Sequence, residues 1–104
     1  MKIVGVAACT AGIAHTYIAR EKMNKAAEVR GHTIQCETQG TIGVENELDP
    51  EKIKESDVVL LAVDIAITGM ERFKGKKVIK IDTGTLIKNP IAFIQKVEKL
   101  MQKA

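Results

Sequence analysis

The sequence predicts an α/β protein built on an open parallel sheet. Two short apolar runs, 3–8 and 58–63, have the length and composition of strands that are buried on both faces. Segments with helical spacing of apolar residues separate these runs from further strand-like segments. The order is strand, helix, strand, short helix, strand, helical turn, strand, helix. This alternation is typical of four parallel strands joined by right-handed crossovers, with helices on both faces of the sheet.

The first half of the chain supplies two of these strands and one long helix. Residues 3–8 form the first strand, and residues 16–30 follow as an amphipathic helix that Gly31 caps at its C-terminus. Polar and apolar side chains alternate over residues 33–38, as in a half-exposed edge strand. Residues 39–48 are polar and contain glycine, which indicates a loop at the carboxyl edge of the sheet.

The second half supplies a short helix, a strand, a helical turn, a strand and a final helix, at 50–55, 58–63, 65–74, 78–81 and 90–101. Asp49 and Pro50 fit the N-cap and first residue of the short helix. Asn89 and Pro90 begin the last helix in the same way. Before that helix, residues 82–85 indicate a second polar segment at the carboxyl edge.

The segment that joins the first strand to the first helix combines a nucleophile with inward-facing backbone donors. Cys9 ends the strand, and Gly12 is free to adopt positive φ, so that successive N–H groups can turn inward. The loop also faces a helix N-terminus, whose partial positive charge stabilises a thiolate and binds a phosphoryl group. The expected phosphate-binding loop consists of Thr10, Ala11, Gly12, Ile13, Ala14, His15 and Thr16. We therefore expect Cys9 to be reactive, the alternative being a small cysteine that only packs.

The spacing from Cys9 to His15 and Thr16 parallels the Cys-x5-Arg-Ser/Thr loop of cysteine-dependent phosphatases. Here His15 occupies the arginine position, which removes a permanent bidentate phosphate clamp. We therefore expect a site that holds a phosphocysteine and passes it on. A cysteine-dependent phosphatase is one alternative, and a non-catalytic signalling or binding module is the other.

Length and composition indicate one domain spanning 1–104. The chain has 45% hydrophobic and 28% charged residues, as ordinary globular proteins do. It has no apolar run near the ~20 residues of a membrane helix and no signal-peptide pattern, so we expect a cytoplasmic protein without direct membrane insertion. The net charge of +3 and three aromatic residues (one Tyr, two Phe) do not favour nucleic-acid binding.

The two cysteines, Cys9 and Cys36, are expected to be free thiols, with Cys36 in the core. The chain spacing of Cys9, His15 and Cys36 matches no zinc motif, so we expect no metal and no cofactor. His32 follows Gly31 in a turn and is expected to be exposed, without a role.

The segment Cys9-Thr-Ala-Gly-Ile-Ala-His-Thr16 resembles the active-site loop of the fructose-family enzyme IIB components of the bacterial phosphoenolpyruvate-dependent sugar phosphotransferase system, which is usually Cys-Pro-Thr-Gly-Ile-Ala-His-Thr. Five further segments resemble family sequence in the same order and spacing: 37–40, 42–43, 45–48, 62–65 and 71–73. The resemblance covers essentially the whole chain. It departs from the usual loop at Thr10 and Ala11, where the family has proline and threonine.

The resemblance implies a phosphoryl carrier with the sheet order 2-1-3-4. Cys9 would accept a phosphoryl group from a phosphohistidine of enzyme IIA and pass it to a sugar, expected to be fructose, that the membrane-embedded enzyme IIC imports. The protein would then meet the inner face of the membrane transiently, through enzyme IIC. Gln39 and Gly40 would lie beside the loop, and Asp64 would either line it or form structural hydrogen bonds. Arg72 would support the phosphate or a partner, or form a surface ion pair.

Overall fold

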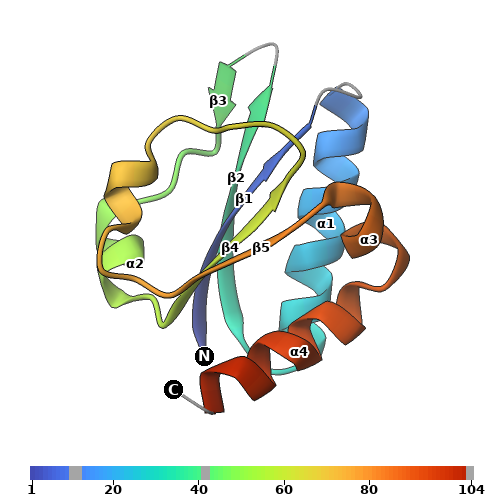
Figure 1. The fold of residues 1–104 in the computed structure, drawn as a ribbon, viewed down its shortest axis with the longest axis vertical. Helices are drawn as coiled ribbons and strands as arrows, with labels where there is room; N and C mark the ends of the chain where they lie inside the picture. The colour runs from blue at the N-terminus through green and yellow to red at the C-terminus, as the bar shows by residue number, and fades with distance from the viewer. Residues whose placement is uncertain (10–12, 41–42, 103–104) are drawn as a thin grey trace.

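A five-stranded sheet forms the centre of the computed structural model, which describes residues 1–9, 13–40 and 43–102 (Figure 1). Its strands are β1 Lys2–Ala8, β2 Thr33–Gly40, β3 Gly43–Glu45, β4 Val58–Val63 and β5 Val78–Ile81. They lie in the order β3-β2-β1-β4-β5. All neighbours are parallel except β2 and β3. The expected α/β fold is therefore confirmed, and β1 is its central strand.

The prediction of four strands is wrong because β3 adds an antiparallel strand at the edge. Residues 39–48 were expected to be a loop, yet β2 continues to Gly40 and pairs with β3 from Thr38↔Glu45 to Gly40↔Gly43. β2 is consequently an inner strand rather than the expected edge strand. Gly43 has a φ of +96°, a conformation that side chains other than glycine rarely adopt. A strand of three residues is too short to show alternation in the sequence.

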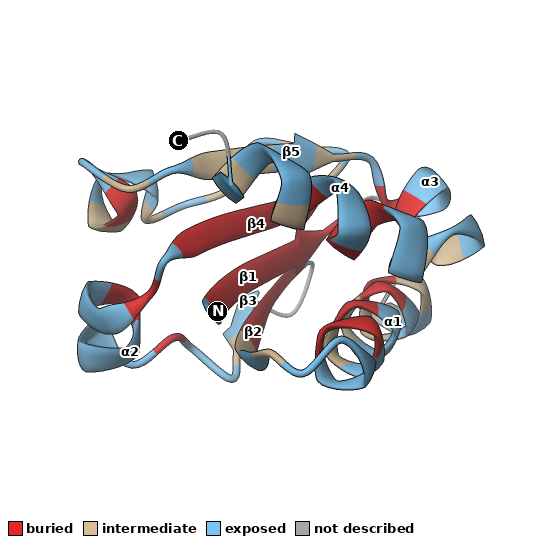
Figure 2. Ribbon diagram, turned by 90° about the horizontal axis from the view of Figure 1, so that it is seen from below, coloured by how far each residue is buried: buried red, intermediate tan, exposed pale blue. Residues whose placement is uncertain are grey.

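Helices cover both faces of the sheet (Figures 1 and 2). The helical elements are α1 Ile13–Val29, α2 Pro50–Glu55, the 3₁₀ helix η1 Met70–Phe73, α3 Thr83–Lys88 and α4 Pro90–Gln102. One core lies between the sheet and α1, α3 and α4, and a second core lies between the sheet, α2 and η1. Figure 2 shows the buried strands β1, β2 and β4 between these layers. No helix in the described part of the chain is long and apolar enough to cross a membrane.

α3 is a helix that the sequence pattern did not predict. Asp82 lies at its N-cap and accepts a hydrogen bond from the Thr85 N–H at 2.9 Å, and Thr83 is fully buried in the first turn. The segment 82–85 was expected to be a polar loop because its three hydroxyl and carboxylate side chains resemble loop composition. These groups instead cap the helix and bind neighbouring segments.

The core depends on a close approach of α1 to β1 at Gly5. A Cβ atom added there would lie 2.7 Å from Met23 Cε and 3.0 Å from Cys36 Sγ, both closer than van der Waals contact permits. Cys36 is buried, as expected, and it is a free thiol like Cys9. Glycine at this position lets α1 lie close to the strand that ends at Cys9.

The prediction that His32 is exposed and without a role is wrong. His32 is half-buried, and the N-terminal ammonium of Met1 donates to its Nδ1 at 2.8 Å. Because an ammonium can only donate, the ring carries its proton on Nε2, which donates to Glu98 at 2.6 Å. Arg30 donates to both carboxylate oxygens of Glu98, at 2.7 and 3.1 Å. These contacts join the end of α1, the start of β1 and α4 at the edge of the sheet opposite Cys9 (Figure 1).

Candidate functional site

Cys9 lies where the carboxyl ends of three parallel strands meet. It follows Ala8 of β1, which pairs with Gln39 of β2 and Val63 of β4. The backbone N–H of Asp64, just after β4, donates to the Ala8 carbonyl at 2.9 Å. Ligands of open α/β sheets bind outside this edge. The Cys9 side chain is itself only 4% exposed, so its sulfur lies in a largely desolvated position.

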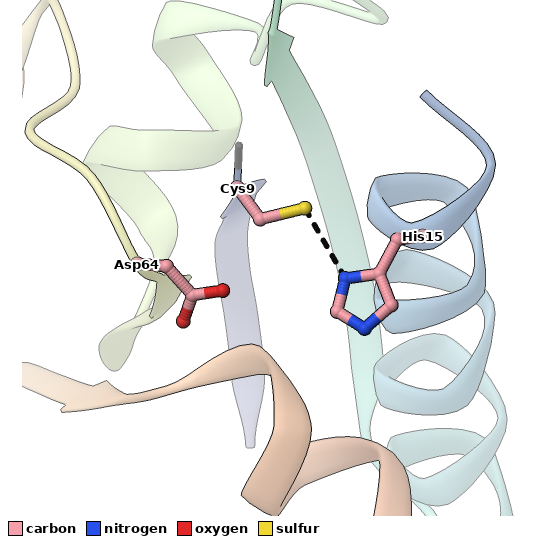
Figure 3. Close-up of side chains that lie close together, drawn as sticks. All are labelled: Cys9, His15 and Asp64. Atoms are coloured by element: carbon pink, nitrogen blue, oxygen red, sulfur yellow. Dashed lines mark hydrogen bonds between the residues drawn. The ribbon is translucent and has the colours of Figure 1, made fainter. Parts of the chain in front are cut away.

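Two side chains from the first turns of α1 contact the Cys9 sulfur. The Thr16 Oγ1 lies 3.2 Å from Sγ, and the His15 Nδ1 lies at the same distance (Figure 3). Thr16 is buried at 3% exposure and His15 is half-buried, so one side chain approaches the sulfur from the interior and the other from nearer the surface. A hydroxyl that donates to sulfur stabilises negative charge on it. The arrangement therefore favours sulfur as a nucleophile and as a leaving group.

Asp64 lies at the same edge, and the structure gives it the structural hydrogen bonds that were one of its two expected roles. Its carboxylate accepts from the Thr83 N–H at 3.0 Å and from the Thr83 hydroxyl at 2.5 Å. One donor atom each of Cys9, His15 and Asp64 nevertheless lie within 4.8 Å of one another. Asp64 is exposed, so its carboxylate borders the site from the solvent side while α3 fixes its position (Figure 3).

The expected phosphate-binding loop is described only in part. Thr10, Ala11 and Gly12 lie outside the described residues, so their expected backbone donation stays a prediction. Ile13 and Ala14 belong to the first turn of α1, which begins three residues earlier than the 16–30 helix that the sequence indicated. The helix start is therefore closer to Cys9 than expected.

Gln39 and Arg72 are brought together by Glu37, a residue to which the sequence analysis gave no individual role. Arg72 donates to both carboxylate oxygens of Glu37, at 2.8 and 2.9 Å, and Gln39 donates to the same carboxylate at 2.7 Å. Glu37 is fully buried. Burial raises the pKa of its carboxyl, but hydrogen bonds from Arg72, the Leu48 N–H and Gln39 outweigh this and lower the pKa below its ordinary value.

Arg72 is thus part of a largely buried ion pair, not the surface pair that was one expectation. Its guanidinium also donates to the carbonyl oxygens of Gly69 and Thr68, at 2.8 and 3.4 Å, and within the described ranges none of its hydrogen bonds reaches Cys9. The side-chain oxygen of Gln39 accepts from the Thr68 N–H at 2.9 Å. These hydrogen bonds connect the carboxyl end of β2 to residues 68–72. The alternation over residues 33–38 predicts that Glu37 lies on the solvent-exposed face of the strand. In the structure residues 68–72 cover that face, and this explains why Glu37 is buried.

Tyr17 and Glu45 form a hydrogen bond on the β3 side of the site. The Tyr17 hydroxyl donates to the Glu45 carboxylate, and this bond, together with burial, raises the pKa of the Tyr17 hydroxyl. The two residues join α1 to β3 beside Thr16. Gly40 lies at the end of β2 in the same small hollow, which Thr16 also lines. This contact could not be predicted, because β3 itself was not predicted.

A family model described as "PTS system, Lactose/Cellobiose specific IIB subunit" matches residues 4–96. The chain is 42% identical over 97 residues to the PTS system fructose-like EIIB component 2 of Escherichia coli K12, covering 93% of this chain and 92% of that protein. It is 45% identical over 91 residues to the fructose-like PTS system EIIBC component of the same organism, covering 86% of this chain and 19% of that longer protein.

The structural similarity is equally extensive. A crystal structure of a domain of the fructose-specific IIABC component from Borrelia burgdorferi superposes with a TM-score of 0.84 at 48% identity. The match covers 90% of this chain and 89% of that domain.

Proposed function

Because the chain belongs to the IIB family of the phosphotransferase systems, we propose that Cys9 is its phosphoryl carrier. The family makes the chain a component of a phosphotransferase. The observation that carries the assignment to Cys9 is its position at the end of the central strand, with the Thr16 hydroxyl and the His15 imidazole each 3.2 Å from its sulfur. Residues 1–104 would act as one fructose-type IIB domain.

In the first step the Cys9 thiolate attacks the phosphorus of a phosphohistidine on enzyme IIA. The sulfur–phosphorus bond forms as the nitrogen–phosphorus bond breaks, and the electron pair of that bond returns to the imidazole of the donor. The loop from Thr10 to His15 and the start of α1 would hold the transferred phosphoryl group, because helix N-termini bind phosphate through backbone N–H groups and a partial positive charge. Thr16 remains hydrogen-bonded to the sulfur throughout.

In the second step a sugar hydroxyl held by enzyme IIC attacks the same phosphorus. The oxygen–phosphorus bond forms, the sulfur–phosphorus bond breaks, the electron pair returns to Cys9 as thiolate, and a base at the interface takes the hydroxyl proton. The Thr16 hydroxyl stabilises the departing thiolate. No step uses a metal or cofactor.

Three further assignments follow from the relatives. Fructose is the proposed sugar, because the names of several similar proteins specify fructose-like or fructose-specific components. Phosphorylated enzyme IIA and enzyme IIC are the proposed partners, and the EIIBC relative joins a B and a C component in one name. The proposed place of work is the cytoplasm, with transient contact to the inner face of the membrane through enzyme IIC.

The residue at the arginine position of phosphatase-type loops distinguishes the proposed phosphoryl carrier from a cysteine-dependent phosphatase. His15 occupies that position, and Arg72 is held by Glu37. Asp49 precedes a proline, as the general acid of small cysteine phosphatases does. In this structure, however, Asp49 is the N-cap of α2 and accepts a hydrogen bond from the Glu51 N–H. These contacts favour a phosphocysteine that is passed on over one that is hydrolysed.

Intact-protein mass spectrometry tests the proposal. Wild type, Cys9→Ser and Cys36→Ser are mixed with enzyme IIA that has been charged from phosphoenolpyruvate. We expect one added phosphoryl group on wild type and on Cys36→Ser, none on Cys9→Ser, and loss of the added mass when enzyme IIC and fructose are supplied. A phosphoryl group on Cys9→Ser would overturn the assignment to Cys9.

The two loop departures are tested in the same assay. Thr10→Pro combined with Ala11→Thr restores the usual family loop. If only this double variant gains mass, the departures impair transfer while Cys9 remains the acceptor. If neither protein gains mass from a donor that charges another IIB component, the carrier assignment is wrong.

A further inference from the structure

Three side chains with different donor atoms converge at the mouth of the site. Cys9 comes from the end of β1, His15 from the first turn of α1 and Asp64 from the segment after β4 (Figure 3). Their sulfur, nitrogen and oxygen donor atoms lie within 4.8 Å of one another. We propose that Cys9, His15 and Asp64 form a binding site for a thiophilic divalent cation, with Zn²⁺ as the best match.

The distances are close to those that tetrahedral zinc requires. Zinc binds cysteine sulfur at ~2.3 Å and histidine nitrogen or carboxylate oxygen at ~2.0–2.2 Å, which places neighbouring donor atoms about 3.3–3.6 Å apart. Cys9 Sγ and His15 Nδ1 already lie 3.2 Å apart. Bringing the Asp64 carboxylate from within 4.8 Å to this separation needs a movement of at most about 1.5 Å, which a side-chain rotation supplies.

The donor set selects a particular class of metal. A thiolate combined with an imidazole favours zinc and similar transition metals, whereas Mg²⁺ and Ca²⁺ prefer sites built from oxygen alone. Three protein ligands leave a fourth position open for water or a small anion. Cys9 is buried, His15 is half-buried and Asp64 is exposed, so the three ligands extend from the interior to the surface.

Asp64 is held as metal-ligating carboxylates usually are. The Thr83 N–H and hydroxyl donate to its two oxygens, at 3.0 and 2.5 Å. A carboxylate has about four acceptor positions, so beside these two bonds it can still bind a metal. Hydrogen bonds of this kind orient ligands and contribute to metal affinity. The spacing of cysteines and histidines along the chain does not reveal the site. Its third ligand, Asp64, follows β4, which is far from Cys9 in sequence although it pairs with β1.

Metal and phosphoryl group would exclude each other, because both bind the Cys9 sulfur. This consequence rests on the proposed function, whereas the metal site itself does not. Zn²⁺ bound at Cys9 would stop the sulfur from accepting a phosphoryl group, and a phosphocysteine would stop the metal from binding. The site would make the carrier sensitive to free zinc.

Cobalt titration tests the site directly, with Co²⁺ alone as the probe and Zn²⁺ added afterwards. Thiolate coordination gives a sulfur-to-cobalt charge-transfer absorption. We expect this band in wild type, its loss on adding Zn²⁺, and its absence in Cys9→Ser. His15→Gln and Asp64→Asn should each raise the Kd at least about tenfold, because even the loss of an outer hydrogen-bonding partner costs about 10–100-fold.

The chain offers one matched control for each ligand. Cys36→Ser removes the other thiol, which is buried and whose pKa burial raises to about 12. His32→Gln removes the other histidine, and Asp82→Asn changes the carboxylate that caps α3 beside Asp64. All three should bind Co²⁺ like wild type. If His15→Gln and Asp64→Asn also bind like wild type, the cation binds a single thiol and the proposal is overturned.

The link to phosphorylation is tested separately. Wild type preincubated with Zn²⁺ should lose its mass gain from charged enzyme IIA, and a chelator should restore it. Because the cobalt band is read without any phosphoryl donor, a band that follows the three ligands supports the metal site even if Cys9 never gains a phosphoryl group. Absence of the band in wild type overturns the metal site even if Cys9 is phosphorylated normally.

Discussion

Thr16 presents its hydroxyl to the Cys9 sulfur from the buried side of the site. A hydrogen bond to a charged group contributes ~1.5–3 kcal/mol, which corresponds to about 10–100-fold in rate if it acts on the departing thiolate. We therefore expect Thr16→Val, which keeps the side-chain shape, to slow phosphoryl transfer from Cys9 to the sugar by at least about tenfold. Single-turnover transfer from phosphorylated protein measures this rate.

Thr16→Ser serves as the rescue variant, because it keeps a hydroxyl that can reach the sulfur at the observed 3.2 Å. Its transfer rate should lie much closer to wild type than that of Thr16→Val. Unfolding in urea should show that both variants remain folded. Equal rates for Thr16→Val and wild type would show that the hydroxyl has no part in the transfer.

Arg72 compensates the negative charge of Glu37 inside the protein. Glu37 is 0% exposed, and it depends on two hydrogen bonds from the guanidinium, at 2.8 and 2.9 Å. Removing one partner of such a pair leaves a buried charge and costs ~3–5 kcal/mol. We expect Arg72→Met to lower the free energy of unfolding by this amount, as measured by urea denaturation at pH 7.

Removing both charges is the matching control for this prediction. The double variant Glu37→Gln/Arg72→Met has no buried charge left unpaired, so it should be more stable than Arg72→Met alone. A double variant that is less stable than Arg72→Met would show that the Glu37 carboxylate still stabilises the protein without Arg72, through its hydrogen bonds from Gln39 and the Leu48 N–H.

Glu98, the only glutamate of α4, joins this helix to Arg30 and His32 through hydrogen bonds. Hydrogen bonds from Arg30 and His32 lower the pKa of the Glu98 carboxyl from 4.5 to about 2. A folded-state pKa below the unfolded value means that the carboxylate adds stability above pH 4.5 and that this stability is lost as the pH falls towards 2. Glu98→Gln should therefore be less stable than wild type at pH 7, and the difference should shrink towards zero near pH 2.

Urea midpoints measured across this pH range test the expectation. Glu28→Gln is the control, because Glu28 is an exposed residue of α1 and its replacement should leave the pH dependence unchanged. A Glu98→Gln variant with the same acid-induced loss of stability as wild type would contradict the assignment of this loss to Glu98.

The elements that the sequence predicted are those whose pattern is local. β4 is apolar throughout, and α2 begins with Asp49 and Pro50, so both were predicted at their observed bounds. β3 and α3 were missed for the same physical reason. Each is short and polar, and each forms because a neighbour satisfies its groups, namely β2 for β3 and Asp64 for the start of α3.

The residues of the site likewise divide into those that lie close together in sequence and those whose place depends on distant contacts. Cys9, His15 and Thr16 lie within eight residues of sequence, and their spacing was enough to predict that they lie close together. Glu37 could not be identified, because its burial depends on Arg72, 35 residues further along the chain. The place of Asp64 beside Cys9 likewise depends on the pairing of β1 with β4, which sequence spacing alone does not fix.

At the scale of the whole molecule, β1 separates two groups of polar contacts. Cys9 follows the carboxyl end of β1 and contacts Thr16, whereas His32 contacts Met1 at the amino end of β1 and also contacts Glu98. Seven residues of strand at ~3.3 Å each place the two groups about 20 Å apart. Sites more than ~7–10 Å apart without shared partners contribute additively to stability, within about 0.5 kcal/mol.

We therefore expect Thr16→Val and Glu98→Gln to act independently. Their changes in unfolding free energy should sum to that of the double variant within about 0.5 kcal/mol. The double variant should also transfer phosphoryl groups at the rate of Thr16→Val alone, because the hydrogen bonds of the Glu98 carboxylate join Arg30 and His32 at the opposite end of the sheet. Urea denaturation and single-turnover transfer on the four proteins check both statements. A larger coupling would mean that α1, which extends from Ile13 to Val29, transmits changes at one end of the sheet to the other.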